Sequence, residues 1–337
     1  MRRGLRAAAA LLLALAAAAT MAAGPAGAGR GSEPDDLRVV SFNVLHGAIC
    51  PDDSDGCQLP DRMELLGQRL EAAGCPQVVG LQEVSGRVYR AVRNLPAIEA
   101  CDYEIVLPRP KSLDRELVLA SLEVGETKVV KLVGGFRTAS RVELESPVGP
   151  VVVVVTHQDG DVAPGEPGAD ATCTEAVCPA PCDPGTPFLA CQTTVAADLA
   201  EKVGGKRAIR ILMGDFNVTP ASARYQGLVD DGWTDTHLAA GNAECDATTG
   251  TGCTSGRRDD VVDDMKDPNA RQQQRIDFIF VKAPRSCAAS FDPEADADGD
   301  GLGTGIWDDP VVDGPGGMVF VSDHSATSAD LTCEGSA

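Results

Sequence analysis

The stretch Arg210–Pro220, RILMGDFNVTP, decides the fold, because an apolar run ends abruptly in an acid, an aromatic residue and an amide. A run that closes at Gly214 is typical of a short core strand, so Asp215 and Asn217 emerge at its carboxyl end. Layered folds place reactive groups at such strand ends. Asp and Asn also cap ordinary turns, and this pair alone leaves both interpretations open. A carboxylate beside a carboxamide offers an acceptor for water or a metal and a donor for an anionic oxygen, which suits phosphoester hydrolysis.

The rest of the chain repeats this pattern of apolar runs that end in polar residues. Residues 150–155, Pro followed by five Val, predict a central strand buried on both faces, which ends at His157. We expect further strands at 37–44, 77–81, 103–107, 117–122, 128–133, 141–144, 275–281, 318–321 and 325–331. Helices are expected at 62–73, 87–95, 193–203 and from just after Pro220 to Val229.

The first 28 residues have the pattern of a secretory signal peptide. Arg2, Arg3 and Arg6 precede an Ala/Leu run, and small residues follow as far as Ala28. A membrane anchor is the alternative, although the apolar run is short for a span of about 20 residues. Residues 29–337 contain no internal repeat and no linker, so we expect a single domain with loop insertions at about 158–190, 240–272 and 285–315.

The composition is strongly acidic. With 29 Lys+Arg against 50 Asp+Glu, the formal net charge is −21 at pH 7, and removal of residues 1–28 takes away only basic residues. A surface of this kind offers no broad basic face for nucleic acid or anionic lipid. It favours solubility and the binding of cations.

All 12 Cys follow the expected signal peptide, and an even number in an exported chain indicates disulfides. No C-x-x-C pair occurs, so zinc ribbons and thioredoxin-like redox motifs are not supported. Proximity and placement in the expected elements favour the pairs Cys50–Cys57, Cys75–Cys101, Cys245–Cys253 and Cys287–Cys333. We expect the remaining four to staple one loop in an order that the sequence leaves open: Cys173, Cys178, Cys182 and Cys191.

Eight polar residues stand just after or within apolar runs: Asn43, Glu83, His157, Asp215, Asn217, Asp277, Asp323 and His324. In chain order their motifs SFNV, LQE, THQDG, GDFN, RIDFIF and SDH resemble those of the endonuclease/exonuclease/phosphatase superfamily. This is the fold of pancreatic-type deoxyribonuclease, apurinic endonucleases, bacterial sphingomyelinases and inositol polyphosphate phosphatases. The likeness runs from about Arg38 to Leu331, and it is specific because the motifs occur jointly. It implies a four-layer α/β sandwich, in which two packed mixed β-sheets lie between helices, with the site at one rim.

The resemblance also implies a metal site. Glu83 resembles the principal Mg²⁺ ligand of the family, with Asn43 beside it and Asp323 close by, and Mn²⁺ is the alternative metal. Mg²⁺ takes few carboxylates and keeps waters and substrate oxygens in its shell, so this small set suffices. An ordinary turn residue is the alternative for Asn43.

The remaining residues have implied roles in orientation and proton transfer. Asp215 and Asn217 resemble the pair that orients the attacking water and the phosphoryl group, and His157 resembles an imidazole that contacts the phosphate. His324 resembles the general base, paired with Asp277, because an Asp on the far ring nitrogen fixes the tautomer of a His. The alternative for Asp277 is an acid that closes a hairpin.

Three further segments stand outside this set. His46 and His237 lack a matching motif, so we expect surface or packing roles for them. Residues 115–122, RELVLASL, lack the glycine and Ser-Arg that the family often shows at this strand end, which removes support for phosphate contacts there. The third segment contains Asp296, Asp298 and Asp300, whose spacing matches the start of a calcium-binding loop. A structural Ca²⁺ site and a solvated acidic loop are the two interpretations of this segment.

These features predict a secreted, monomeric, Mg²⁺-dependent phosphoesterase that cleaves phosphodiester bonds by in-line attack of an activated water. An extracellular nuclease is the leading prediction. The alternatives are a sphingomyelinase or phospholipase C-type hydrolase and a phosphatase for small molecules. An aromatic content of only 4% argues against an inserting hairpin, and the acidic balance argues against nucleic acid. A non-catalytic binding module is the last alternative, against which the complete set of site residues argues.

Overall fold

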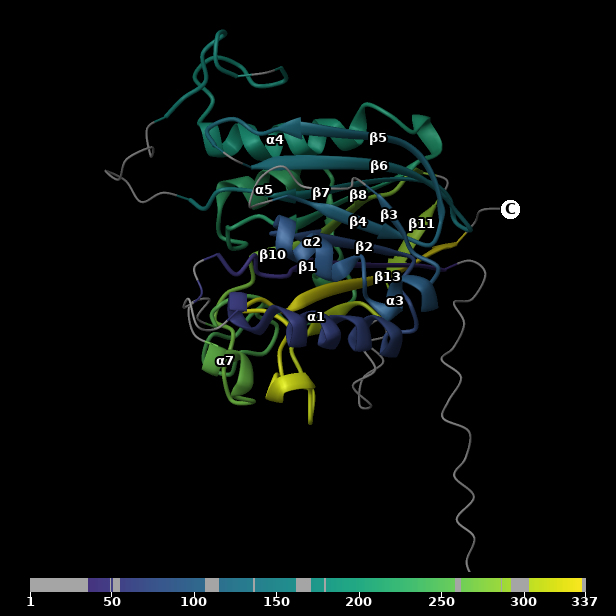
Figure 1. Cartoon of the computed structure of the whole chain (residues 1–337). Coiled ribbons are helices and arrows are strands. Elements are labelled where there is room, and N and C mark those ends of the chain that lie inside the picture. Colours follow the sequence, from purple (N-terminus) through teal and green to yellow (C-terminus); the bar gives the residue numbers. More distant parts are fainter. Residues whose placement is uncertain are drawn as a thin grey trace, which may run out of the picture.

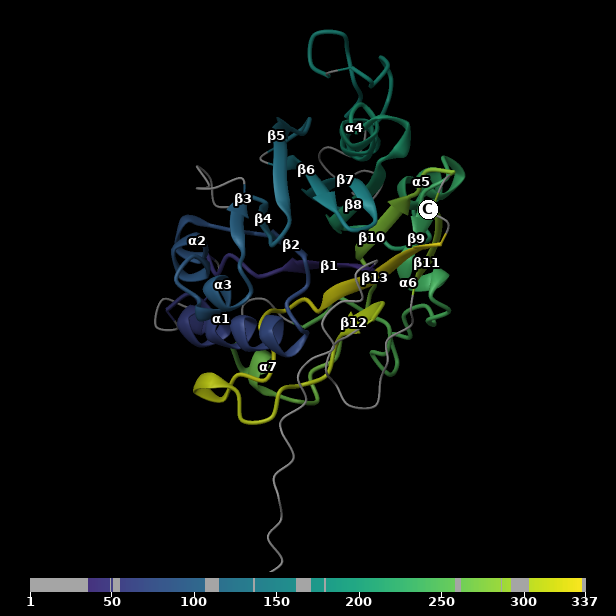
Figure 2. The same cartoon turned by 90° about the vertical axis from the view of Figure 1, so that its right-hand side faces the viewer.

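The structure is a computed structural model that describes residues 36–48, 50, 55–106, 115–135, 137–161, 171–178, 180–257, 262–285, 287–291 and 303–334. Two sheets lie face to face with helices outside them (Figure 1). The two halves, each a sheet with helices on its outer face, are seen in Figure 2. The predicted four-layer sandwich is therefore confirmed.

The first sheet contains the chain's first and last strands. Its members are β1 (Asp36–Asn43), β2 (Val78–Gln82), β3 (Glu104–Val106), β4 (Leu117–Ala120), β11 (Ala288–Phe291), β12 (Gly305–Trp307) and β13 (Ala326–Glu334). Their order is β11-β13-β1-β2-β4-β3, with β12 paired to β13. The sheet is mixed, because β1 pairs in parallel with β2 and antiparallel with β13.

The second sheet is built on the strand of the GDFN motif. Its members are β5 (Glu123–Lys131), β6 (Thr138–Ser146), β7 (Gly149–His157), β8 (Ile209–Asp215), β9 (Thr234–Asp235) and β10 (Asp277–Lys282). They follow the order β5-β6-β7-β8-β10-β9, in which β7 and β8 are parallel. The all-Val strand β7 is central, as predicted.

The helices are α1 (Asp55–Ala72), α2 (Gly86–Val92), α3 (Pro96–Ala100), α4 (Phe188–Glu201), α5 (Ala223–Asp230), α6 (Thr236–Ala239) and α7 (Val262–Lys266), with 3₁₀ turns η2 (Gly205–Arg207) and η3 (Pro315–Gly317). Near the start of α1, Gly56–Gln58 have positive φ, so its regular part starts close to the predicted start of this helix at residue 62. In Figure 2, α1 and α3 cover the first sheet and α4 covers the second.

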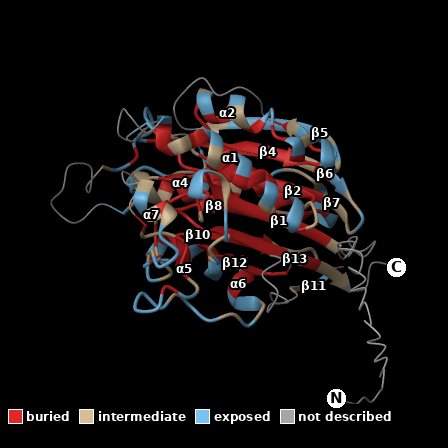
Figure 3. Cartoon of the chain, turned by 60° about the horizontal axis from the view of Figure 1, so that its bottom comes forward, coloured by how far each residue is buried: buried red, intermediate tan, exposed pale blue. Residues whose placement is uncertain are grey.

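Strand alternation explains the layers. In β8, Ile211 packs into the core between the two sheets, whereas its neighbour Leu212 packs into the core beneath α4. In β1, Val39 faces the other sheet and Val40 faces α1. Successive side chains of a strand point to opposite faces, so a strand inside two layers must be apolar throughout. Figure 3 shows the sheets as the buried centre of the molecule.

The sheets approach each other closely at Gly80 of β2. A Cβ at this position would lie 2.6 Å from Met213 Cε and 2.7 Å from Val155 Cγ2. The glycine therefore sets the spacing of the sheets below the LQE motif, and any larger residue would push β2 away from β8.

One predicted strand is wrong. Residues 318–321 form no strand, because their backbone groups bond to a helix and a loop: the amides of Val319 and Phe320 donate to Met265 O of α7, and Val319 O accepts from Val311 N. The apolar residues of this segment pack beneath α1. A short apolar run of this kind has the same hydrophobic pattern as a buried strand, so the sequence does not distinguish the two.

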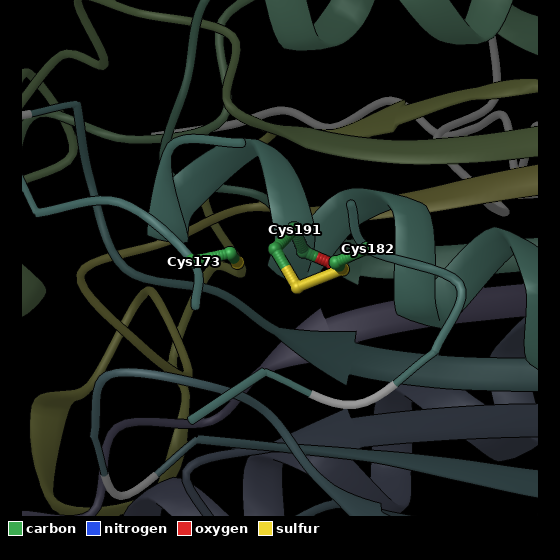
Figure 4. Close-up of side chains that lie close together, drawn as sticks. All are labelled: Cys173, Cys182 and Cys191. Carbon is green, nitrogen blue, oxygen red and sulfur yellow. A yellow bond between two sulfur atoms is a disulfide. The ribbon is translucent and has the colours of Figure 1, made fainter. Parts of the chain in front are cut away.

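All 12 Cys are paired, and the four predicted disulfides are confirmed. The stapled loop contains the pairs Cys173–Cys178 and Cys182–Cys191. Figure 4 shows Cys173 beside the second of these bonds. Three sulfurs of this loop lie within 4.8 Å of one another, but each belongs to a disulfide, so this group is not a metal site.

Two predictions concern residues outside the described ranges. They are the signal peptide at 1–28 and the calcium loop of Asp296, Asp298 and Asp300. Among the described residues, no helix combines the length and the apolar character that crossing a membrane requires.

Candidate active site

Three neighbouring strands of the second sheet bring an imidazole and two acids side by side. His157 of β7 lies opposite Asp215 of β8, and Asp215 lies opposite Asp277 of β10. All three residues are at most 2% exposed. Asp215 therefore occupies the centre of a buried row at the rim.

His324 joins this row from the segment that enters β13. Its Nδ1 lies 2.9 Å from Asp277 Oδ2, so the ring donates and the carboxylate accepts. Its Nε2 lies 3.9 Å from Asp215 Oδ2 and 4.0 Å from Asp323 Oδ2. Because Asp277 holds the proton at Nδ1, neutral His324 has its basic lone pair on Nε2, directed toward two other acids.

The loop before β10 holds Asp277 in place. The Oγ1 of Thr254 accepts hydrogen bonds from the backbone amides of Ile276 and Asp277, at 3.0 and 3.1 Å. Among the described residues, Asp277 Oδ1 is buried without a hydrogen-bond partner. A buried, unsatisfied carboxylate oxygen is costly unless it serves a site, so the position of Asp277 is more than a hairpin closure.

The first sheet contributes Asn43 and Glu83. The Nδ2 of Asn43 donates to Glu83 Oε1 and to Asp215 Oδ2, each at 3.1 Å, and thus links the two sheets across the rim. The Oδ1 of Asn43 accepts from Leu45 N at 3.1 Å and keeps its second lone pair. The amide therefore separates two carboxylates, and a metal would have to use its oxygen.

His46 belongs to the site although no motif marked it. Its backbone amide donates to Glu83 Oε2 at 2.9 Å, and its Nε2 lies 3.6 Å from the same oxygen. Its Nδ1 accepts from Ala48 N at 2.8 Å, so the ring proton is on Nε2 and faces Glu83. The expectation of a surface or packing role was wrong. The sequence feature that could have identified His46 is its position three residues after Asn43.

His157 is oriented by Arg137, a second residue that the sequence analysis missed. Arg137 Nη1 lies 2.7 Å from His157 Nδ1, and a guanidinium only donates, so Nδ1 accepts and Nε2 carries the proton. That Nε2 lies 3.3 Å from Asp215 Oδ2. Arg137 Nε also donates to Asp159 Oδ1 at 3.0 Å. Arg137 lies in the turn between β5 and β6, which has no periodic hydrophobic pattern, so the sequence did not mark this residue.

Asn217 completes the row through backbone and side chain. Its amide N donates to Asp215 Oδ1 at 2.8 Å, and its Nδ2 donates to Gln158 O at 2.9 Å and lies 3.1 Å from His157 Nε2. Its φ is 52°, and Glu83 has φ 60°. Left-handed conformations of non-glycine residues cost about 1–3 kcal/mol each and gather at functional sites.

All eight predicted site residues are thus brought together. Each lies within 4.0 Å of another member through the contacts described above. Gly214 makes this packing possible, because a Cβ there would lie 1.8 Å from Thr156 O of the neighbouring strand.

Arg62 is a third missed residue and lies behind the site. It is fully buried, and its guanidinium donates to five backbone carbonyls: those of Val44, Leu45, Gly56, Cys57 and Val321. These carbonyls flank the segments that carry Asn43 and Asp323. Burial lowers the pKa of Arg62 to about 10, with Asp323 and Glu83 opposing the shift, so it stays charged at neutral pH.

The rim carries an excess of negative charge. Burial alone would lower the pKa of His324, but Asp277, Asp323 and Asp215 raise it well above its ordinary value. Burial would raise the pKa of Glu83, but His157, His46 and Asn43 hold it below its usual value. Glu83 is therefore an anion at neutral pH. A neutral His324 requires that part of the surrounding negative charge be compensated.

The donor set fits a divalent cation. Glu83, Asp323 and the amide oxygen of Asn43 are hard oxygen ligands of the kind that Mg²⁺ and Mn²⁺ accept. Asp215, Asp277 and His324 form a second group whose ligand atoms lie within 4.8 Å of one another. In that group the ring Nδ1 already bonds to Asp277, which favours a proton-transfer role over metal ligation.

The comparisons with known proteins agree with this site. A sequence profile of the endonuclease/exonuclease/phosphatase family matches residues 40–324, so the chain belongs to that family. Enzymes of this family are divalent-metal-dependent phosphoester hydrolases, and so is this chain. No curated protein sequence matches it.

Solved structures show the same fold. A truncated TDP2 from Caenorhabditis elegans matches with a TM-score of 0.57 at 18% identity, over 88% of this chain and 98% of that one. A family member from Bacteroides vulgatus matches with a TM-score of 0.59 at 18% identity, over 89% and 99%. A mannosyl-6-phosphatase from Bacteroides thetaiotaomicron matches with a TM-score of 0.59 at 18% identity, over 88% and 99%.

Proposed function

We propose that this protein is an exported, Mg²⁺-dependent phosphoesterase that cleaves phosphodiester bonds by in-line attack of water. The observation that carries the proposal is the Asp277–His324 hydrogen bond beside Asp215, opposite Glu83 across the rim. Export is supported by the signal-peptide pattern of residues 1–28 and by six disulfides.

The chain's own residues would divide the chemistry between them. The attacking water loses a proton to His324 Nε2, its oxygen bonds to phosphorus, and the bond to the leaving oxygen breaks. The leaving oxygen then takes up a proton, so the products are a phosphomonoester and an alcohol. Asp277 stabilises the charged ring after proton transfer, and Asp215 orients the water. Glu83 and Asp323, with Asn43, would hold a divalent cation, which when bound would withdraw charge from the phosphoryl oxygens.

Nucleic acid is the first substrate to test, because the motif set resembles nucleases. A panel of DNA, RNA, sphingomyelin, bis(p-nitrophenyl) phosphate and p-nitrophenyl phosphate would be assayed with Mg²⁺, with Mn²⁺ and with chelator. We expect metal-dependent hydrolysis of at least one member, lost in His324→Ala. Failure on every member with either metal would overturn the proposal. A mature protein that retains residues 1–28 would contradict the export part alone.

A small polar phosphoester is the second candidate substrate. The net charge of −21 disfavours a long polyanion, which needs basic residues along its path. The fold neighbour from Bacteroides thetaiotaomicron is named for a sugar phosphate, at 18% identity. In the panel, p-nitrophenyl phosphate turned over much faster than DNA or RNA would favour this candidate.

A further inference from the structure

A polar cavity lies next to the SDH segment, outside the residues described above. It has a volume of about 220 Å³ and is lined by residues 249–251, 257 and 268–272, by Asp308 and Asp309 and by Phe320. Pockets for drug-sized ligands span roughly 300–1,000 Å³, so this cavity admits a smaller group and no stretch of nucleic acid.

Arg257 is the buried anchor of this cavity. It is 7% exposed, and its guanidinium carbon lies 3.4 Å from the centre of the Phe320 ring. Its Nε donates to Ala270 O, and its Nη1 donates to Ser325 Oγ, both at 3.3 Å. The Arg257 side chain itself lines the cavity. A guanidinium held in this way can donate hydrogen bonds from its remaining N–H groups to a ligand oxygen.

The cavity is joined to the catalytic segment by direct bonds. Gln272 Nε2 donates to Asp323 O at 2.8 Å and to Ser325 Oγ at 3.2 Å, and Gln272 Oε1 accepts from Arg257 N at 3.1 Å. The segment from Phe320 to Ser325 therefore carries a cavity wall at its start and His324 near its end. A group bound in the cavity would therefore contact the segment that carries His324.

The lining selects for a neutral ligand rich in hydroxyls. Two guanidiniums, Arg257 and Arg271, share the cavity with two carboxylates, Asp308 and Asp309, and Asn269 adds an amide. The carboxylates disfavour a second phosphate, and the guanidiniums disfavour a cation. A hydroxyl both donates and accepts, so a polyol can satisfy both kinds of partner.

We propose that this cavity binds the polyhydroxylated leaving group of the substrate, which makes a sugar or polyol phosphoester the substrate class. The inference rests on the second candidate of the proposed function, a hydrolase of small polar phosphoesters. It deepens that function by assigning the loop insertion near 240–272 to substrate selection.

The test compares substrates that share the phosphoryl group and differ in the leaving group. Glucose 6-phosphate, ribose 5-phosphate and myo-inositol 1-phosphate would be compared with p-nitrophenyl phosphate in the wild type, in Arg271→Gln and in Asp309→Asn. Controls are Arg93→Gln and Asp230→Asn, which change exposed residues outside the cavity. We expect kcat/KM for one sugar phosphate to exceed that for p-nitrophenyl phosphate. This selectivity should fall about tenfold in each cavity variant, the effect of one lost hydrogen bond, and stay constant in the controls.

Two results would overturn the proposal. One is a wild type that prefers p-nitrophenyl phosphate to every sugar phosphate, and the other is a selectivity that the cavity variants leave unchanged. If the protein hydrolyses no phosphoester at all, the proposed function fails separately. The cavity is then tested by saturation-transfer NMR with free glucose, ribose and myo-inositol. Binding lost in Arg271→Gln supports the cavity, and no binding overturns it.

Discussion

Two buried ionic clusters begin two residues apart on the same segment, and their compositions differ. Arg275 faces the layer of helices, where it pairs with Asp235 at 2.7 Å and with Glu244. Asp277 faces the rim, where its partner is His324 and its neighbour is Asp215. In the first cluster a guanidinium contacts both acids directly, whereas in the second the direct partners of the acids are imidazoles and an amide.

The difference separates a structural cluster from a reactive one. Glu244 and Asp235 overcome the effect of burial and raise the pKa of Arg275, and Tyr225 donates to Asp235 at 2.6 Å, so the charges of the first cluster are satisfied. Glu244 is 43% exposed, whereas the rim buries Asp215 and Asp277 almost completely and has an excess of carboxylates. Paired charges fix a packing arrangement, and an uncompensated set attracts a cation and shifts proton affinities.

Removal of the base should have the largest effect on the rim. We expect His324→Ala to lower kcat by about 10²–10⁴-fold, the range for a positioned acid–base group, with metal affinity nearly unchanged. Asp277→Asn should give a smaller loss, because the base remains and only its tautomer and charge stabilisation suffer. Since the two residues act as one unit, the double variant should be little worse than His324→Ala. Losses that multiply in the double variant would mean that the residues act independently.

Removal of the guanidinium should affect the other cluster through stability. Arg275→Met leaves Asp235 and Glu244 without their cation, and breaking a buried pair costs about 3–5 kcal/mol. We expect the free energy of unfolding in urea to fall by this amount, while kcat of the folded fraction stays within a few-fold. Arg93→Met, at an exposed position, is the control. A loss of activity larger than the loss of folded protein would show that the two clusters are coupled.

Weakening the metal site tests whether the negative excess serves a cation. Glu83→Gln removes one anionic ligand without emptying the core, so we expect apparent Mg²⁺ affinity to fall about 10–100-fold, with partial rescue at high Mg²⁺ or Mn²⁺. The control is Glu64→Gln on the exposed face of α1. Unchanged metal dependence in Glu83→Gln would refute the assignment of Glu83.

The smallest effect concerns His237, beside the Arg275 cluster. Burial lowers the pKa of His237, and Arg275 adds to this shift. The unfolded chain, with a pKa of about 6.5, then takes up a proton where the folded chain does not. The free energy of unfolding should be highest above pH 6.5 and decrease as the pH falls toward the lower folded pKa. Urea titrations of wild type and His237→Asn from pH 8 to 5 check this, because the variant should lack the part of the pH dependence of the unfolding free energy that His237 causes.

Much of the fold was predictable because strands buried on both faces leave a distinct pattern. The run of five Val and the alternation around Ile211 could not sit at a surface. Residues 318–321 were assigned wrongly, because a short apolar segment packed beneath a helix has the same composition as a strand.

The site was predictable where a polar residue interrupts an apolar run, as at Asp215 or Asp277. Parallel and antiparallel pairing then aligned these strand ends. Arg137 and His46 reach the site from loops, whose paths follow no period. Arg62 was hidden for a different reason, since a charged residue in an amphipathic helix normally marks the exposed face, and here it is satisfied by carbonyls from three segments.

The pairing of β1 with β13 has a consequence for how the enzyme is made. Asn43 leaves the first strand and His324 precedes the last, and these strands are neighbours through pairs such as Leu37 with Leu331. A ribosome delivers them some 280 residues apart. A nascent chain therefore has no complete site until β13 has emerged and paired with β1, so the hydrolase stays inactive while the residues between them are made.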